Sequence, residues 1–113
     1  MSEVTIYHNP RCSKSRQTLE LLRARGIEPR VVEYLKTPLA ESMLSALLDQ
    51  LELPVQQLVR EQDFRALLLP EPEDEQGWIA ALAAHPEIMQ RPVVVAGDKA
   101  RLGRPPENVL EIL

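Results

Sequence analysis

Cysteine is almost absent from this chain, which has a single one, Cys12, among its 113 residues. One thiol cannot form a disulfide within the chain, and it cannot build an all-thiolate zinc site. A lone free thiol is typical of a reducing compartment. The two histidines, His8 and His85, lie far apart in the sequence and do not indicate a metal site. We therefore expect no bound metal.

The sequence also lacks a long apolar run and a basic segment at its beginning. The first residues, Met1-Ser2-Glu3-Val4, do not resemble a signal peptide, and no stretch suggests a transmembrane span. We expect a cytoplasmic protein. The length predicts one domain, 1–113, and the hydrophobic fraction of 44% predicts a globular chain with its own core.

The net charge of −4 argues weakly against nucleic-acid binding, and its distribution is uneven. Acidic residues predominate over 61–88, whereas basic residues predominate over 91–104. We interpret most of these charges as solvated surface. Some of the arginines could instead converge on a small anion.

Apolar periodicity predicts a β-α-β unit at the start of the chain. We expect a strand at 4–7, a helix at 13–25 that Gly26 ends, and a strand at 30–34. Such a unit has parallel strands and a right-handed crossover.

A helical block is expected next, beginning at Thr37-Pro38 with an N-cap and a proline at the first helical position. Its first helix should bury an apolar stripe composed of Leu39, Met43, Leu44, Leu47, Leu48 and Leu51. A short helix is expected from Pro54 to about Val59. The segment 60–69 is ambiguous, and a further helix is expected over 74–84.

The period then changes to that of strands. We expect an antiparallel hairpin with strands at 92–96 and 99–102, followed by a short helix over 107–113. The whole order matches a thioredoxin-like α/β fold, with a mixed four-stranded sheet and a helical insertion at roughly 37–88. In this fold a proline, often cis, begins the third strand and faces the first helix, and Pro92 occupies that place.

Cys12 stands between a predicted strand and a predicted helix, within Asn9-Pro10-Arg11-Cys12-Ser13-Lys14-Ser15-Arg16. Unpaired N–H groups and the positive end of the helix dipole favour an anion at such a place. Both effects lower the pKa of a thiol, and the thiolate is the nucleophile. We expect the cationic side chains of Arg11, Lys14 and Arg16 to act in the same direction.

The chain has no second cysteine three residues after Cys12, where two-thiol redox proteins carry C-x-x-C. Ser15 takes that position, and its hydroxyl can donate a hydrogen bond to the sulfur. Any mixed intermediate on Cys12 must therefore be resolved by an external thiol. The arginine of a tyrosine-phosphatase loop is also missing, since Thr18 stands there, so oxyanion ligands must come from elsewhere.

Four separated segments occur in order along nearly the whole chain: Tyr7–Arg16, Arg60 after Leu58-Val59, Arg91-Pro92 and Gly103-Arg104-Pro105. Together they resemble the ArsC family, the glutaredoxin-coupled arsenate reductases. The best-known members carry a longer C-terminal tail, so the chain resembles a short form of the family.

The resemblance implies an oxidoreductase whose cysteine attacks arsenate and reduces it to arsenite. It implies glutathione and glutaredoxin as co-substrates, no bound cofactor, and no nucleic-acid or membrane partner. Arg60, Arg91 and Arg104 would bind the oxyanion, because each planar guanidinium can pair with two oxygens. His8 and Ser15 would stabilise the thiolate.

Two alternatives stay open. The related Spx group contains transcriptional regulators that bind RNA polymerase, although those with a redox switch commonly use the cysteine pair that Ser15 removes. Cys12 could also exchange with glutathione as a monothiol oxidoreductase acting on another substrate, with the arginines binding glutathione carboxylates.

Overall fold

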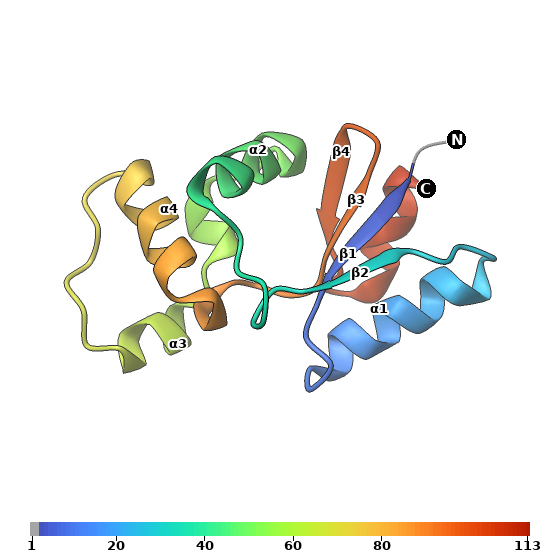
Figure 1. Ribbon diagram of the computed structural model, residues 1–113, viewed down its shortest axis with the longest axis horizontal. Helices are drawn as coiled ribbons and strands as arrows, with labels where there is room; N and C mark the ends of the chain where they lie inside the picture. The colour runs from blue at the N-terminus through green and yellow to red at the C-terminus, as the bar shows by residue number, and fades with distance from the viewer. Residues whose placement is uncertain (1–2) are drawn as a thin grey trace. The chain divides into compact units, whose positions relative to one another are not determined.

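The computed structural model describes residues 3–113 and contains a mixed four-stranded sheet of order β2-β1-β3-β4 (Figure 1). Strand β1 (Val4–His8) pairs in parallel with β2 (Arg30–Glu33) and antiparallel with β3 (Val93–Ala96). Strand β4 (Lys99–Leu102) continues the sheet as the second arm of a hairpin with β3. The expected β-α-β unit and hairpin are both confirmed.

The chain divides into two compact units. One contains the sheet and consists of the chain up to Thr37 together with Arg91–Leu113; the other is Pro38–Gln90. The expectation of a single domain, 1–113, with a helical insertion at roughly 37–88 stays a prediction.

The sheet unit buries one face of its strands against helix α1 (Ser13–Ala24) and the final 3₁₀ segment η3 (Pro106–Ile112). Each of these elements contributes to a fully buried cluster composed of Ile6, Leu22, Val94 and Val109. Gly26 follows α1 with a φ of +77°, a left-handed conformation that glycine adopts without steric cost. It therefore ends the helix as expected.

The regular elements of the second unit are helices, together with an isolated bridge between Val59 and Met89. Its elements are α2 (Glu41–Leu51), η1 (Val55–Leu58), α3 (Glu61–Ala66), α4 (Glu75–Ala84) and η2 (Pro86–Ile88). Helix α4 packs against α2, η1 and η2 and buries Trp78, Ile79 and Leu82, as expected. Asp74 caps α4 by accepting a hydrogen bond from the Gly77 N–H at 2.8 Å.

Three expectations for the elements are wrong in detail. Helix α2 begins at Glu41 rather than at Thr37-Pro38, because the N–H groups of Lys36 and Thr37 both bond to the Glu33 carbonyl and form a turn after β2. Met43 is 49% exposed, although the rest of its stripe is buried. The final helix is of the 3₁₀ type.

No helix within residues 3–113 is both long enough and apolar enough to cross a membrane.

Candidate active site

Cys12 occupies the N-cap position of α1, directly after the turn that follows β1. Its own N–H donates to the Asn9 carbonyl at 3.0 Å, and the Asn9 side-chain oxygen accepts from the Arg11 N–H at 3.0 Å. These two bonds fix the turn. The thiol is free and partly exposed, so it is both held in place and accessible.

The pKa of the Cys12 thiol lies below its ordinary value. Burial opposes ionisation and is the largest single influence, but hydrogen bonds and charge outweigh it. The backbone N–H of Ser15, the side chain of Arg91 and the backbone N–H of Lys14 all donate to the sulfur, and the charge of Arg91 adds to this effect. The expected thiolate therefore has a structural basis.

The positive charge at the sulfur comes from Arg91, which the sequence places far from Cys12. Lys14 contributes through its backbone, and Arg16 donates from Nη1 to the Pro10 carbonyl at 2.9 Å. We expected side chains near Cys12 in the sequence to supply the positive charge at the sulfur. The charge comes instead from Arg91, just before β3.

Ser15 lies in the site as expected, but its two polar groups have different partners. Its backbone N–H faces the sulfur, whereas its hydroxyl lies 2.5 Å from His8 Nδ1 and accepts from the Asn9 N–H at 3.0 Å. The side chain is fully buried. We expected the hydroxyl to bond to the sulfur, but it joins His8 to the turn at Asn9.

His8 ends β1 and is only 6% exposed. Burial lowers its pKa, Glu33 raises it to a smaller extent, and the charges of Arg23 and Arg16 lower it further. The histidine contacts Ser15, so any influence of its ring on Cys12 passes through that serine.

Arg91 and Arg104 lie together, each immediately before a proline in a cis peptide bond. Arg104 Nη1 donates to the Arg91 carbonyl at 3.0 Å, and the Gly103 N–H donates to the Pro92 carbonyl at 2.9 Å. The cis bond expected before Pro92 is present, and a second one precedes Pro105. The Arg104 side chain is thus held at the backbone of Arg91. Joint oxyanion binding by the two arginines stays a prediction.

Gly103 is a residue that the sequence analysis named only as part of a motif. A Cβ atom there would lie 2.6 Å from Thr18 Oγ1 and 2.7 Å from Pro92 Cγ. Only glycine therefore lets this segment approach both α1 and the start of β3. A glycine directly before an Arg-Pro pair was the available signal, but its steric role depends on the fold.

Arg60 belongs to the other unit, where it is the N-cap of α3. Its Nε lies 2.7 Å from Asp63 Oδ2, and its N–H donates to the Ile88 carbonyl at 2.6 Å. These contacts hold its backbone and guanidinium within the helical unit. Participation of Arg60 in oxyanion binding stays a prediction.

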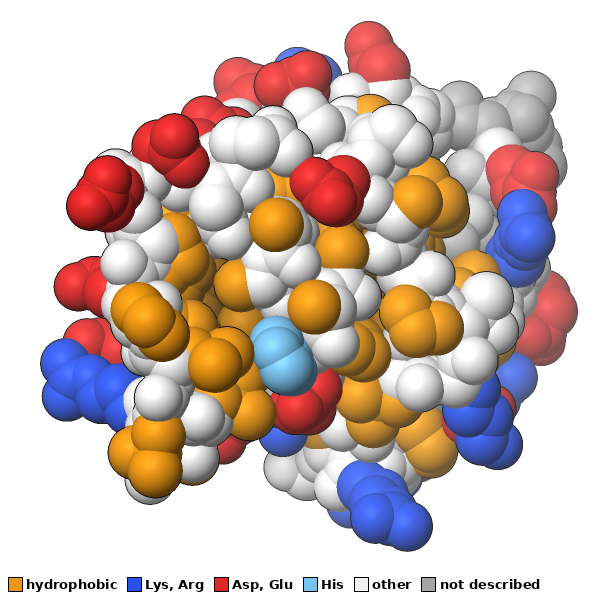
Figure 2. Space-filling view, turned by 60° about the vertical axis from the view of Figure 1, so that its left-hand side comes forward, with side chains coloured by type: hydrophobic (Ala, Val, Ile, Leu, Met, Phe, Trp, Pro, Cys, Tyr) orange, Lys and Arg blue, Asp and Glu red, His pale blue; other side chains and the backbone are white. Residues whose placement is uncertain are grey.

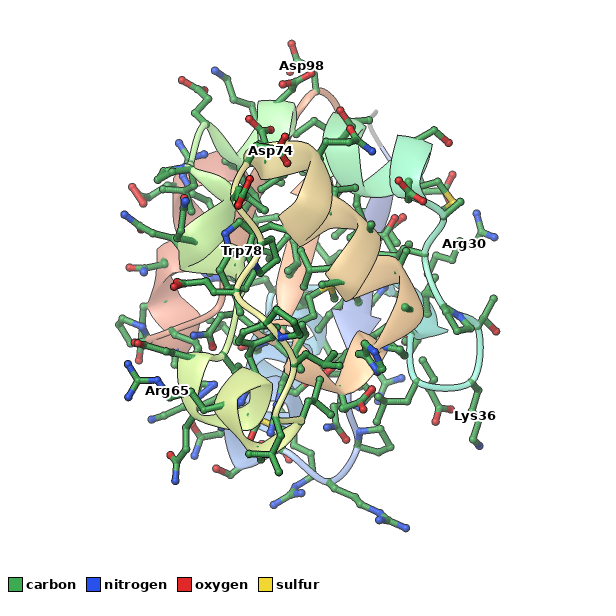
Figure 3. The ribbon with its side chains drawn as sticks, turned by 90° about the vertical axis from the view of Figure 1, so that its left-hand side faces the viewer. Arg30, Lys36, Arg65, Asp74, Trp78 and Asp98 are labelled. Carbon is green, nitrogen blue, oxygen red and sulfur yellow. The ribbon has the colours of Figure 1, made fainter. Side chains whose placement is uncertain are left out.

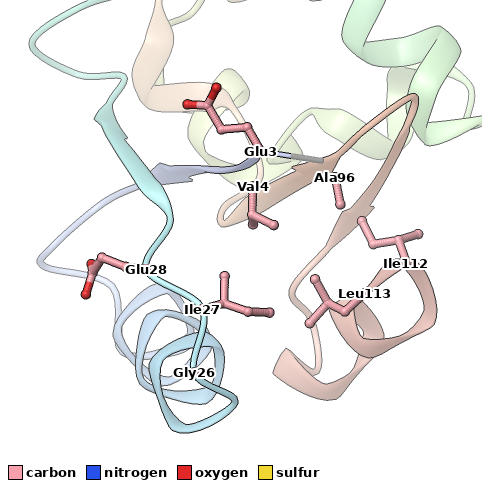
Figure 4. A pocket seen from close by; sticks show the side chains of 8 residues that line it. All are labelled: Glu3, Val4, Gly26, Ile27, Glu28, Ala96, Ile112 and Leu113. Carbon is pink, nitrogen blue, oxygen red and sulfur yellow. The ribbon is translucent and has the colours of Figure 1, made fainter. Parts of the chain in front are cut away.

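A separate pocket of about 480 Å³ lies at the other end of β1, between Val4, Ile27 and Ile112 (Figure 4). Its charged lining residues are Glu3 and Glu28. Carboxylates repel an oxyanion, so this pocket is unsuited to the oxyanion that the sequence leads us to expect.

Comparison with known proteins shows the family of this chain. Residues 7–112 match the ArsC family. The chain belongs to this family. Its thioredoxin-like fold follows from the sheet and from close structural relatives in the family.

Several ArsC relatives align over almost their full length. The uncharacterized protein YfgD of Escherichia coli is 48% identical, with 98% of this chain and 97% of the relative covered. An arsenate reductase of Haemophilus influenzae is 42% identical, with 97% and 98% covered. The structure of an arsenate reductase from Vibrio cholerae has a TM-score of 0.92 and 46% identity, covering 99% of this chain and 98% of its own.

Proposed function

We propose that this ArsC-family protein is an arsenate reductase that uses Cys12 as its nucleophile. The observation that carries the proposal is the sulfur itself: two backbone N–H groups and the Arg91 side chain stabilise its thiolate. The same guanidinium would supply positive charge to an incoming oxyanion. Preorganised cations offset the repulsion between an anionic nucleophile and an anionic substrate.

The reaction begins when the Cys12 thiolate attacks arsenic(V) and a protonated oxygen leaves as water. Glutathione replaces a second oxygen on arsenic as its thiolate. Glutaredoxin then attacks the glutathione sulfur, and the electron pair of the As–S bond reduces arsenic to the +3 state. The products are a glutaredoxin–glutathione disulfide and Cys12-bound arsenite, which water releases. Arg91, Arg104 and Arg60 are our candidates for binding the oxyanion.

External thiols are required because the chain supplies none of its own after Cys12. Ser15 stands at the position of a resolving cysteine, and its buried hydroxyl is engaged with His8 and Asn9. The same substitution argues against an Spx-like two-cysteine switch. A cytoplasmic location fits this chemistry, since glutathione keeps thiols reduced there.

The test is arsenite formation by the reduced protein in the presence of arsenate, glutathione, glutaredoxin and an NADPH-coupled recycling system. We expect arsenate-dependent NADPH oxidation that Cys12→Ser abolishes and that Arg91→Gln lowers by roughly one to three orders of magnitude. Arg16→Gln is the matched control. Rapid glutathionylation of Cys12 without arsenite formation would contradict the proposal and favour the monothiol alternative.

A further inference from the structure

The helical unit carries an apolar groove that the arsenate chemistry does not use. It has a volume of about 410 Å³, and its apolar lining is contributed by Phe64, Leu68, Leu69 and Trp78. A smaller hollow of about 190 Å³ shares Glu61, Glu71 and Trp78 with it. Hydrophobic side chains gather on the face that Figure 2 brings forward, and Figure 3 shows Trp78 on α4 and Arg65 on α3.

Leu68 is the most unusual residue of this groove. Its side chain is 91% exposed, and its φ of 58° is a left-handed conformation that glycine usually supplies at the end of a helix. Leu69 beside it is 43% exposed. Beneath this edge, the rings of Phe64 and Trp78 pack with their centroids 4.8 Å apart. Single exposed leucines are ordinary, but two that border an aromatic-lined hollow form a contiguous apolar surface.

The charge around the groove is negative. The unit Pro38–Gln90 has ten Asp and Glu residues against two arginines. Both arginines already pair with acidic neighbours, Arg60 with Asp63 and Arg65 with Glu61. Glu71 lines the groove, and Glu73 and Glu75 are exposed on the same stretch of chain. Arg65 also lines the groove, but it is paired with Glu61, so carboxylates are in excess where a molecule approaches.

We propose that this groove docks a basic amphipathic helix of a separate partner protein. Its apolar face would cover Leu68 and Leu69, and its Lys or Arg side chains would approach Glu71 and the neighbouring carboxylates. Helix-in-groove recognition uses this combination of apolar anchors and complementary charge. The proposal stands independently of the arsenate reductase reaction, because it uses no residue of the Cys12 site.

A second copy of the chain is a less suitable occupant, although its sheet unit is rich in basic residues. Docking of a basic surface onto an unlike acidic groove would be a head-to-tail contact. Such contacts form open filaments unless the rotation between copies happens to close. A separate partner protein can bind one groove per chain without forming a filament.

The test uses Trp78, the only tryptophan in the chain, as a fluorescent reporter inside the groove. The probe is a leucine–lysine peptide of about 14 residues, with leucines at helical spacing. Two matched peptides serve as comparisons: one has glutamate in place of lysine, and the other has serine in place of leucine. The protein variants are Leu68→Gly, Glu71→Gln and, as a control on α2, Met43→Ser.

We expect the leucine–lysine peptide to shift the Trp78 emission saturably and both comparison peptides to bind at least about tenfold more weakly. Leu68→Gly should weaken binding about tenfold, and Glu71→Gln a few-fold with a smaller salt dependence. Met43→Ser should bind as the parent protein does. Equal binding of all three peptides, no effect of Leu68→Gly, or concentration-dependent self-association of the protein that is lost in Leu68→Gly would overturn the proposal.

Discussion

A single buried serine connects the two parts of the nucleophile's surroundings. The backbone N–H of Ser15 faces the Cys12 sulfur, while its hydroxyl joins His8 to the turn at Asn9. The spacing of three residues placed Ser15 near the thiol, but not the atom that would reach it. Helix geometry gives the reason: the N–H groups of the first turn point toward the N-cap, and Cys12 is that residue.

Arg91 is the residue whose removal should change the thiol most directly. Its guanidinium bonds to the sulfur and adds positive charge, so Arg91→Gln should raise the pKa of Cys12. At neutral pH we expect alkylation by iodoacetamide to slow by roughly two- to tenfold. Thiolate absorbance across a pH titration measures the pKa, and the alkylation rate gives an independent reading. Arg16→Gln, whose guanidinium donates to the Pro10 carbonyl, should leave both nearly unchanged. Equal effects of the two substitutions would show that general charge, and not the contact, controls the thiol.

At the scale of elements, the sequence was most informative where one hydrophobic period was long and unbroken. The apolar runs in β1 and β3 and the stripe of α2 predicted their elements, and Gly26 after α1 predicted a helix end. The predicted start of α2 at Thr37-Pro38 was wrong, because a threonine followed by a proline is common both at a helix N-cap and in a turn. The segment 60–69 stayed ambiguous because α3 is only six residues long.

The end of α3 offers a test of backbone strain. Leu68 holds a φ of 58°, which costs an L-residue about 1–2 kcal/mol and costs glycine almost nothing. Its side chain is 91% exposed, so truncation loses little burial. Glycine also gives the unfolded chain more conformational entropy, which offsets part of this gain. The net effect of Leu68→Gly should be to stabilise the fold by about 0.5–1 kcal/mol.

Urea unfolding measures this change, and Met43→Gly is the matched comparison. Met43 is also exposed, but it lies inside α2 in a right-handed helical conformation. Glycine there should destabilise the protein by about 1 kcal/mol. The strain argument fails if both substitutions destabilise the protein to the same extent.

At the scale of the whole molecule, the candidate site joins segments that the sequence separates by about ninety residues. The motif resemblance indicated Arg91 and Arg104, and the fold explains why they meet: Gly103 leaves room against Thr18 and Pro92. Local periodicity carries no information on such long-range contacts. The source of the charge at the sulfur, and the partner of the Ser15 hydroxyl, could therefore be learned only from the three-dimensional structure.

Global stability should depend on pH through His8. Burial lowers its pKa in the folded protein, despite the opposing charge of Glu33, so the folded state favours the neutral ring. As pH falls below about 6.5, the unfolded chain binds the proton more readily and stability decreases; the loss levels off below the folded pKa. Between pH 7.5 and 5.5 this contribution cannot exceed about 1.4 kcal/mol. In urea unfolding at both pH values, His8→Gln should lose less stability on acidification than the parent protein, because the buried ring with the lowered pKa is absent. The same loss in His8→Gln and in the parent would show that His8 does not supply the pH dependence.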